Sequence, residues 1–577
     1  MHYQPAAFTF LSFLFTLRNC IGGNLTLPFT SSIVIREIRT SRDRWVEIRF
    51  GALCGPCKMI QSLVSKKCMK KKITRASFTL LVIFLIFLNL YSPCPVSAHP
   101  SVKYVILLIG DGLGANHIQA TNSFTHTIPI YQNWDSFWMT TYPKGSSYDP
   151  AQAWSNFDYI KNGATDSAAA ASAMYTGEKT SNGSLSVTAD GEARLFTIAE
   201  KAHSLNWAAG AVSSVYISHA TPGAWFSHNL SRSNGFAIAD EALWGDPNTT
   251  GTASTDPLYA GSFGPTIPAA DVLIGAGHPY WSGDDYVNQQ MRDRLVIDSS
   301  RSDNFAFVER VSGNPNGGQR LLEAASDPAI TRLVGLFGGA GGNLEYRMAD
   351  GNGLTPENPT LAQMTQAALE VLQRNSNGFV LMVEGGAIDW GSHLNDMNKT
   401  IGEVIAFNEA VQAVVDWVVD PDNGSSWDNT LVIVTADHDC GYLSAAPDSF
   451  SNVPLGAVNM HSLSLEKTMA GSNLRASWED ADLDRVIDAG EQVYWAWNSS
   501  GHTNSLVPIF VKGNGAELFN LYATGSDPIR GDYLDNTNIF DVINAAITTN
   551  QPTPTPGGSP NTSEVRLFIP LVIIAQQ

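Results

Sequence analysis

The stretch Phe379–His393, with the sequence FVLMVEGGAIDWGSH, constrains the fold of this chain most strongly. An apolar run over Phe379–Val383 ends abruptly in Glu384, two glycines, Asp389 and His393. A continuous apolar run of this length is typical of a strand that is buried on both faces. Because sites in open α/β sheets form at the carboxyl ends of strands, the acidic and imidazole side chains after this run are candidate metal ligands.

Three other apolar runs end in the same kind of side chain. They are Lys103–Ile109, followed by Asp111; Ala208–Ile217, followed by His219 and Thr221; and Thr430–Val434, followed by Asp437 and His438. Between them lie helical patterns such as Leu361–Leu372 and Asn398–Val419. Strands that alternate with helices predict an α/β fold, with a mostly parallel central sheet sandwiched between helices. The ligand types at the strand ends suit two Zn²⁺ and one harder cation.

One domain is expected over residues 99–548, because 577 residues suit a large α/β domain with insertions. Within it, residues 235–330 are rich in Gly, Pro, Asn, Asp, Trp and Tyr. We expect an insertion or lid near the site there, with short elements such as Asp271–Gly275.

Residues 69–98 have the features of a secretory signal peptide. Met69 is followed by four basic residues, by the apolar run Phe78–Leu90, and by a small-x-small cleavage site that ends at Ala98. The apolar run is too short for a typical membrane-spanning helix. We therefore expect an exported protein, whether periplasmic, extracellular or at the cell surface.

Residues 1–68 precede this signal, and we interpret them as translation upstream of a biological start at Met69. Within them, Arg44–Leu63 resembles the active-site segment of thioredoxin, with Cys54-Gly-Pro-Cys57 opening a helix. The strands and helices that such a redox site needs do not follow. Cys440 is the only one of the six cysteines beyond the signal, so we expect no disulfide in the body.

The body of the chain is acidic. The formal net charge is -19, yet residues 1–98 hold 13 of the 35 Lys and Arg and only 3 of the 54 Asp and Glu. Such a body is a poor nucleic-acid binder, so a nucleic-acid-binding domain is not expected.

Two C-terminal segments follow the expected domain. Residues 549–563 contain PTPTP and GGSP and predict a flexible or extended linker. The tail, 564–577, is apolar but too short to span a bilayer as a helix. It is open to two interpretations, cell-surface association or a packed terminal strand.

An acidic stretch, Trp478–Glu491, interrupts the pattern. Its acids fall at positions 1, 3, 5, 9 and 12 of a calcium loop, namely Asp480, Asp482, Asp484, Asp488 and Glu491. Ile487 occupies the apolar eighth position, but Arg485 stands where Gly is expected. A solvent-facing acidic loop and a Ca²⁺ site both remain open.

Ser167 opens the alanine-rich run SAAAASAM, which predicts a helix. It is either a helix cap or a side chain placed where backbone N–H groups attract a phosphate. Arg232 is either a surface charge or a bidentate phosphate clamp.

The joint occurrence of six motifs resembles the alkaline phosphatase family over Lys103–Ile547. The motifs are GDGLG at Gly110–Gly114, TDSAAAASAMYTGEKT at Thr165–Thr180, HATPGAWFSHNLSR at His219–Arg232, VEGGAIDWGSH at Val383–His393, TADH at Thr435–His438 and HT at His502. The resemblance implies a phosphomonoesterase that hydrolyses small phosphate monoesters through a phosphoserine intermediate.

The resemblance also implies roles for residues. Ser167 is the expected nucleophile and Arg232 the expected phosphate ligand. The expected metal ligands are Asp389, His393 and His502 for a first zinc, Asp437, His438 and Asp111 for a second, and Asp111, Thr221 and Glu384 for magnesium. The family resemblance leaves a homodimer open.

Two positions beside these ligands vary within the family. His219 stands where some members carry Asp, which weakens the expectation of a strict Mg²⁺ preference. Trp390 stands where others carry Lys or His, and its side chain cannot hold a phosphate-bound water by charge. We expect easier phosphate release and a lower pH optimum than in Lys-bearing relatives.

The alternatives are a phosphodiesterase or sulfatase of the same fold and a non-catalytic metal-binding surface protein. A sulfatase needs a Cys or Ser within C/S-x-P-x-R, whereas alanines follow Ser167. Arg232 would occupy the room that a second ester group needs. The retained catalytic groups argue against a non-catalytic role.

Overall fold

The computed structural model describes residues 33–39, 44–50, 102–245 and 268–548. The chain divides into two compact units, 1–96 and 97–577. In the first unit, β1 (Ile33–Arg39) pairs antiparallel with β2 (Arg44–Phe50). The CGPC motif, the signal segment, the linker and the tail lie outside the described residues. Among the residues described, the helices are all too short or too polar to cross a membrane.

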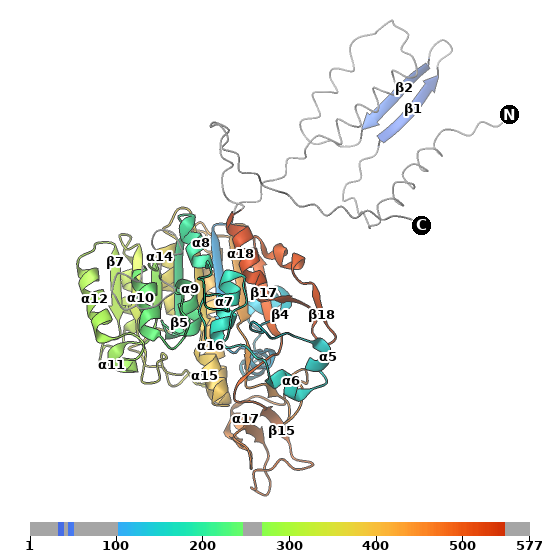
Figure 1. Cartoon of the computed structure of the whole chain (residues 1–577). Coiled ribbons are helices and arrows are strands. Elements are labelled where there is room, and N and C mark those ends of the chain that lie inside the picture. Colours follow the sequence, from blue (N-terminus) through green and yellow to red (C-terminus); the bar gives the residue numbers. More distant parts are fainter. Residues whose placement is uncertain (1–32, 40–43, 51–101, 246–267, 549–577) are drawn as a thin grey trace, which may run out of the picture. The chain divides into compact units, whose positions relative to one another are not determined.

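The second unit is built on one sheet of eleven strands in the described residues (Figure 1). Its order is β18 (Gly525–Asp527), β19 (Gly531–Asp535), β4 (Asp135–Thr140), β17 (Val507–Gly513), β10 (Thr430–Ala436), β3 (Tyr104–Gly110), β9 (Phe379–Gly385), β5 (Ala208–Tyr216), β6 (Val272–Ala276), β8 (Arg332–Leu336) and β7 (Phe305–Glu309).

The four central strands, β10, β3, β9 and β5, run parallel. Every residue of β10, β3 and β9 is buried, as their unbroken apolar sequences predict. The pairing aligns Ala436 with Gly110 and Gly110 with Gly385, so these strands end level with one another. The residues that follow them therefore meet at one edge of the sheet.

Helices cover the sheet on both faces (Figure 1). One group contains α4 (Ala115–Thr125), α13 (Gly317–Ser326), α14 (Leu361–Leu372) and α16 (Met397–Val419). The other contains α7 (Ser167–Thr176), α8 (Ile198–Ser204), α9 (Ala220–Phe226), α10 (Gly235–Trp244) and α18 (Asn538–Thr548). The remaining described α-helices are α5 (Pro150–Ala153), α6 (Phe157–Lys161), α11 (Pro279–Ser282), α12 (Gln289–Ser300), α15 (Ala387–His393) and α17 (Met460–Ser464). The predicted α/β class is confirmed.

The described part of the expected insertion, 235–330, belongs to the main sheet. The strand expected at Asp271–Gly275 is β6, and both β6 and β7 pair in parallel with β8. The region thus extends one side of the sheet. On the other side, β17 runs antiparallel to β10, so the sheet is mixed at that point.

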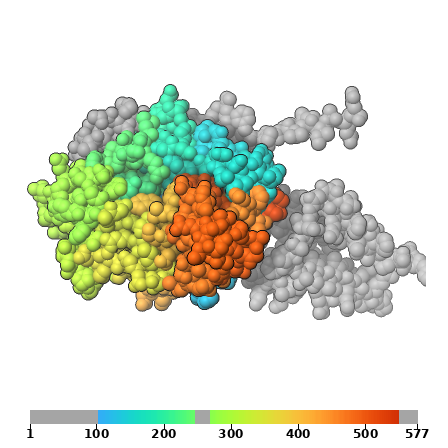
Figure 2. Space-filling model, turned by 90° about the horizontal axis from the view of Figure 1, so that it is seen from below, coloured from blue at the N-terminus to red at the C-terminus, as the bar shows by residue number. Residues whose placement is uncertain are grey.

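A small lobe, residues 443–497, follows the end of β10 and stands apart from the main sheet (Figure 1). It carries an antiparallel sheet of β12 (Leu443–Ser444), β15 (Val493–Trp497), β14 (Arg475–Trp478) and β13 (Glu466–Thr468). In Figure 2 its orange surface occupies the middle of the face seen from below. Beside it, β11 (Asp439–Cys440) pairs with β16 (His502–Thr503), which brings His502 back to the strand ends.

Candidate active site

The site lies at the carboxyl ends of the central strands, where the turn after β3 sets its geometry. Gly112 has a φ of 68°, in the left-handed region that favours glycine. Its backbone N–H donates to Asp437 Oδ1 at 3.0 Å, which ties the end of β3 to the end of β10. A Cβ at Gly112 would lie 2.8 Å from Asp389 Oδ1. Glycine therefore allows three strand ends to approach one another.

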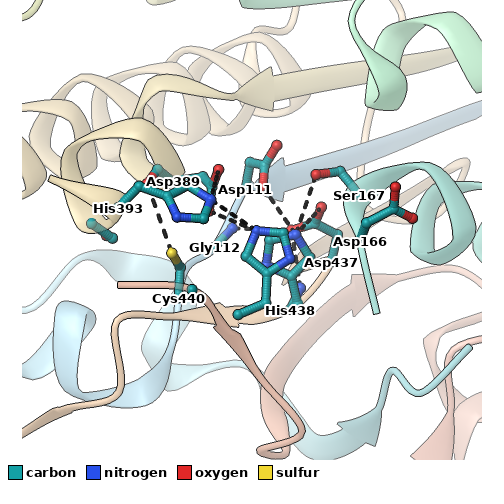
Figure 3. A network of polar contacts seen from close by, with 12 residues as sticks. Asp111, Gly112, Asp166, Ser167, Asp389, His393, Asp437, His438 and Cys440 are labelled. Atoms are coloured by element: carbon teal, nitrogen blue, oxygen red, sulfur yellow. Dashed lines mark hydrogen bonds and ion pairs between the residues drawn. The ribbon is translucent and has the colours of Figure 1, made fainter. Parts of the chain in front are cut away.

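A first group of candidate ligands contains Asp389, His393 and His502, with Cys440 beside them. Figure 3 labels Asp389, His393 and Cys440 of this group. Asp389 and His393 lie one turn apart on α15, and His393 Nε2 is 3.2 Å from Asp389 Oδ2. His502 Nε2 lies 3.4 Å from Asp389 Oδ1. Burial would raise the pKa of Asp389, but the two histidines lower it well below its ordinary value.

The imidazoles of His393 and His502 each turn their Nε2 atom toward the other ring. His393 Nδ1 contacts the carbonyl oxygen of Ser500 at 2.6 Å, and His502 Nδ1 contacts that of Thr165 at 2.8 Å. A carbonyl accepts only, so each Nδ1 carries a proton, and in the neutral imidazole each Nε2 then presents a lone pair. The two Nε2 atoms are 3.1 Å apart. This orientation is the one that metal-binding histidines adopt.

A second group contains Asp111, Asp437 and His438, all fully buried (Figure 3). His438 Nε2 is 3.4 Å from Asp111 Oδ1 and 3.2 Å from Asp437 Oδ2. Burial, followed by the charge of Asp437, raises the pKa of Asp111 well above its ordinary value. Burial is also the main reason that the pKa of Asp437 rises to about 7.

A third group shares Asp111 and adds Glu384 and His219. His219 Nδ1 lies 3.8 Å from Glu384 Oε1, and the hydroxyl of Ser213 donates to Glu384 Oε2. The side chain of Thr221 is fully buried at the start of α9, after the end of β5.

Many buried ligand atoms of these groups have no hydrogen-bond partner among the described residues. They are both carboxylate oxygens of Asp111, Asp389 Oδ1, Asp437 Oδ2, Glu384 Oε1, Thr221 Oγ1, His219 Nδ1 and His438 Nδ1. Orphaned buried polar atoms are costly and call for a partner. Oxygen and imidazole donors that converge in this way fit metal ions, so the residues present suit the cations that the sequence predicts.

Ser167 is the first residue of α7, and the preceding Asp166 is the actual cap, accepting from the backbone N–H of Ala169 at 2.9 Å. The Ser167 hydroxyl is thus not used as a cap. Its Oγ lies 3.2 Å from His438 Nε2, at the positive end of the helix dipole (Figure 3). The structure therefore places Ser167 beside the second group of ligands.

Arg232 reaches the same place from the loop after α9. Its Nη1 donates to Asp166 Oδ2 at 3.0 Å, and its Nη2 lies 3.0 Å from His219 Nε2. The guanidinium is held between two side chains and is partly exposed, which leaves it able to bind an anion.

Trp390 lines the site without offering a ligand atom. Its ring centroid lies 5.8 Å from that of His219 and 6.0 Å from that of Tyr216. Tyr216 stacks on Tyr286 at 3.8 Å, so an aromatic wall continues from the third group of ligands.

Three contributors to the site were not predicted from the sequence. Asp166 holds Arg232, Ser213 holds Glu384, and Cys440 Sγ lies 3.9 Å from the carbonyl oxygen of Asp389. Burial, together with nearby carboxylates, raises the pKa of the Cys440 thiol well above its ordinary value. Asp166 could have been found as the acid next to Ser167, whereas Ser213 and Cys440 carry no local signal.

Nine of the ten residues predicted as catalytic groups or metal ligands are brought together at this edge of the sheet. The tenth, Thr221, lies two residues after His219, at the start of α9. The acidic loop, Asp480–Glu491, lies elsewhere, in the small lobe between β14 and β15.

Comparison with known proteins identifies the family. The sequence model of the family described as "Alkaline phosphatase" matches residues 102–549. The chain belongs to the alkaline phosphatase family. It is accordingly a phosphomonoesterase with divalent metal cofactors.

Similar proteins come from several bacteria. The chain is 31% identical to the alkaline phosphatase of Escherichia coli over 421 residues, which cover 68% of this chain and 80% of that protein. It is 29% identical to alkaline phosphatase 3 of Bacillus subtilis over 458 residues, covering 72% and 85%. Alkaline phosphatase from the Antarctic bacterium TAB5 shares the fold, with a TM-score of 0.52, 23% identity and coverage of 78% and 100%.

Proposed function

We propose that this phosphatase hydrolyses phosphate monoesters through a phosphoserine intermediate on Ser167, with two Zn²⁺ and one Mg²⁺ per chain. The observation that carries the proposal is the set of three converging ligand groups around the Ser167 hydroxyl. Asp389, His393 and His502 would hold the first zinc. Asp111, Asp437 and His438 would hold the second.

The third site is assigned to Mg²⁺ on Asp111, Glu384 and Thr221, which offer oxygen atoms. The imidazole of His219 adds a softer donor that suits Zn²⁺ or Co²⁺. Among proteins of the same fold, a mutant of the TAB5 enzyme in which a histidine is replaced by aspartate has Mg bound in its M3 site. That variant shows that this fold can hold Mg²⁺ when aspartate replaces a histidine.

The reaction divides into two displacements. When bound, the metal ions supply positive charge that lowers the pKa of a hydroxyl or water and stabilises the departing oxygen. Ser167 Oγ attacks the phosphorus atom in line with the ester oxygen, and the bond from phosphorus to that oxygen breaks. Water then attacks the phosphoserine, and the Ser167–phosphorus bond breaks to release inorganic phosphate.

The protein side chains bind and orient the phosphoryl group. The guanidinium of Arg232 donates to its oxygens and offsets their charge, because its fork matches two of them. The N-terminus of α7 adds backbone N–H groups next to Ser167. His393 and His502 are oriented through their Nδ1 contacts, so their Nε2 atoms stay aimed at the site.

Arg232 favours monoesters over diesters. Its guanidinium, fixed by Asp166 and His219, stands where a second ester group would need room. A phosphodiesterase of the same fold is the alternative, and the two differ in which phosphate ester is hydrolysed faster.

Export and surface association complete the proposal. Cleavage after Ala98 would release the domain outside the cytoplasm, where the apolar tail, 564–577, is available for cell-surface association. A homodimer remains compatible with the family.

The test compares p-nitrophenyl phosphate with bis-p-nitrophenyl phosphate, using wild-type protein with and without a chelator. We expect faster hydrolysis of the monoester, loss of activity with the chelator, and recovery on adding Zn²⁺ and Mg²⁺. Ser167→Ala should lower kcat at least about a thousandfold, since the nucleophile is lost. Ser155→Ala, at an exposed serine outside the site, is the control and should retain activity.

Three results would contradict the proposal. Hydrolysis that persisted with the chelator would show that no metal ion is required. Faster hydrolysis of the bis-ester would favour a phosphodiesterase. Full activity of Ser167→Ala would exclude the phosphoserine. Trapping of phosphate on Ser167 at acidic pH, detected by mass spectrometry, provides a direct readout of the intermediate.

A further inference from the structure

The acidic loop between β14 and β15, Glu479–Gln492, has no part in the proposed reaction. It lies in the small lobe, where Figure 1 labels β15 and α17. One carboxylate oxygen from each of Asp480, Asp482 and Asp484 lies within 4.8 Å of the other two. We propose that this loop is a separate binding site for one Ca²⁺.

Asp480 supplies the decisive observation. Its side chain is only 2% exposed, and its Oδ2 is 3.3 Å from Lys467 Nζ. Its other oxygen, Oδ1, is buried and has no hydrogen-bond partner among the described residues. An acidic loop that only faced solvent would leave its carboxylates hydrated, whereas a buried carboxylate oxygen without a partner is costly. A cation shared with the neighbouring acids satisfies it.

The remaining acids of the pattern surround the same loop. Glu491 accepts from the backbone N–H groups of Ala481 and Asp488, each at 2.9 Å, so it holds the two ends of the loop together.

The loop is also anchored to the lobe. Ile487 packs against a cluster of Ala476, Trp478 and Ala496, which lie on β14 and β15. Arg485, which stands where a calcium loop has Gly, has a φ of 65°. It adopts the left-handed backbone conformation that a glycine would provide. The turn is therefore formed although Arg485 replaces the expected Gly.

The donors favour calcium over the cations of the active site. Ca²⁺ takes six to eight oxygen ligands in flexible geometry, and carboxylates on alternate residues supply them. Zn²⁺ prefers His and Cys, neither of which occurs in Glu479–Gln492. Mg²⁺ demands a more regular octahedron and retains its waters.

Calcium at this place would fix the hairpin of β14 and β15. After β15, the chain runs through residues 498–501 to His502, so the lobe connects directly to a predicted zinc ligand. We expect bound Ca²⁺ to raise the unfolding temperature while kcat stays unchanged, because the loop contacts none of the reacting groups.

The test is isothermal titration of CaCl₂ into the full chain, already saturated with Zn²⁺ and Mg²⁺. We expect one Ca²⁺ per chain to bind, with a rise in the melting temperature. The double substitution Asp482→Asn and Asp484→Asn should weaken binding at least about tenfold, since two charged ligands are lost. Both residues are exposed, so the variant is expected to fold.

The exposed Asp303, just before β7 at the edge of the main sheet, provides a matched control. Asp303→Asn should bind Ca²⁺ as wild type does. Absence of binding up to about 5 mM Ca²⁺, beyond the range of weak extracellular sites, would overturn the proposal. Equal binding by the double variant would do so too. Hydrolysis of p-nitrophenyl phosphate, measured in parallel, separates this outcome from a failure of the proposed function.

Discussion

Most side chains of the site are acidic, basic or imidazole groups, whereas Trp390 is aromatic and uncharged. It follows Asp389, a candidate metal ligand, and its ring centroid lies 6.0 Å from that of Tyr216 and 5.8 Å from that of His219. An indole offers one N–H donor and no positive charge. At this position the protein therefore adds apolar surface beside the phosphate site.

Replacing Trp390 with Lys should strengthen inhibition by inorganic phosphate. A charged ammonium would attract the bound product through a hydrogen bond worth about 1.5–3 kcal/mol, which corresponds to at least a tenfold lower inhibition constant. The pH optimum should rise as well. Steady-state inhibition of p-nitrophenyl phosphate hydrolysis provides the measurement.

Trp390→Phe is the matched control, because it keeps an aromatic ring and adds no charge. Its inhibition constant should stay near that of wild type. If Trp390→Lys left phosphate inhibition unchanged, the role assigned to this residue would be wrong.

At the scale of elements, the turn after β3 joins the ends of β3 and β10. Gly112 has a positive φ and also leaves no room for a Cβ beside Asp389. Gly145, in the loop between β4 and α5, has a φ of 86°, but a Cβ added there would meet no other atom within 4 Å. Alanine substitutions at Gly112 and Gly145 therefore distinguish the effect of backbone strain from the effect of a collision with Asp389.

Gly112→Ala should reduce both zinc retention and kcat/KM, because its methyl group would push Asp389 out of place. Gly145→Ala should lower stability by about 1 kcal/mol from strain alone and leave kcat/KM unchanged. Metal content after dialysis and initial rates give the comparison. If the two variants changed kcat/KM equally, the predicted collision of the Gly112→Ala methyl group with Asp389 would be wrong.

His228 illustrates a second element-scale feature, the packing of α8 and α10 around the loop after α9. Its Nδ1 is 2.9 Å from Glu241 Oε1, and its Nε2 is 2.9 Å from the carbonyl oxygen of Leu195 and 3.5 Å from Glu200 Oε2. Burial would lower its pKa, but the carboxylates of Glu200 and Glu241 raise it to about 10.

The stability contributed by His228 should therefore depend on pH. The pKa in the folded state lies above the unfolded value of 6.5. The contribution is thus complete below about pH 6.5 and is lost as the pH rises through about 10. His228→Gln should lower the melting temperature strongly at pH 6, since breaking a buried pair costs about 3–5 kcal/mol, and the difference from wild type should shrink toward pH 10.

Melting curves of both proteins across this pH range test the prediction. His461→Gln serves as control, because His461 is exposed and its pair with Glu479 is on the surface. If the melting temperature of His228→Gln stayed below that of wild type by the same amount from pH 6 to pH 10, the positive charge assigned to His228 would be wrong.

On the scale of the whole molecule, the ten predicted catalytic and metal-binding residues all belong to the second compact unit. The main hydrophobic core also lies there, running from β3 to α18. This unit has its own sheet, core and site, so it should be active by itself.

A chain limited to residues 99–548 should match the full chain in kcat/KM and melting temperature. Purified proteins of both lengths, assayed on p-nitrophenyl phosphate, provide the comparison. A large loss of activity in the shorter chain would show that the flanking segments contribute to the fold or the site.

The sequence by itself determined the central strands and placed the candidate ligands at their ends. Apolar runs such as Phe379–Val383 can only be buried, and the side chains that follow a parallel strand must lie at the carboxyl edge of the sheet. The helix that starts at Ser167 and the long helix ending at Val419 follow from local propensity and periodicity in the same way. Family motifs then supplied the role of each residue.

Only the tertiary structure decided which neighbouring side chains support the candidate ligands. Ser213 and Cys440 reach the site through contacts between segments far apart in the chain, which local patterns do not encode. The same holds for the buried Oδ1 of Asp480 and for the antiparallel pairing of β17. These features depend on long-range packing, because burial and unmet hydrogen-bonding capacity are properties of the folded chain.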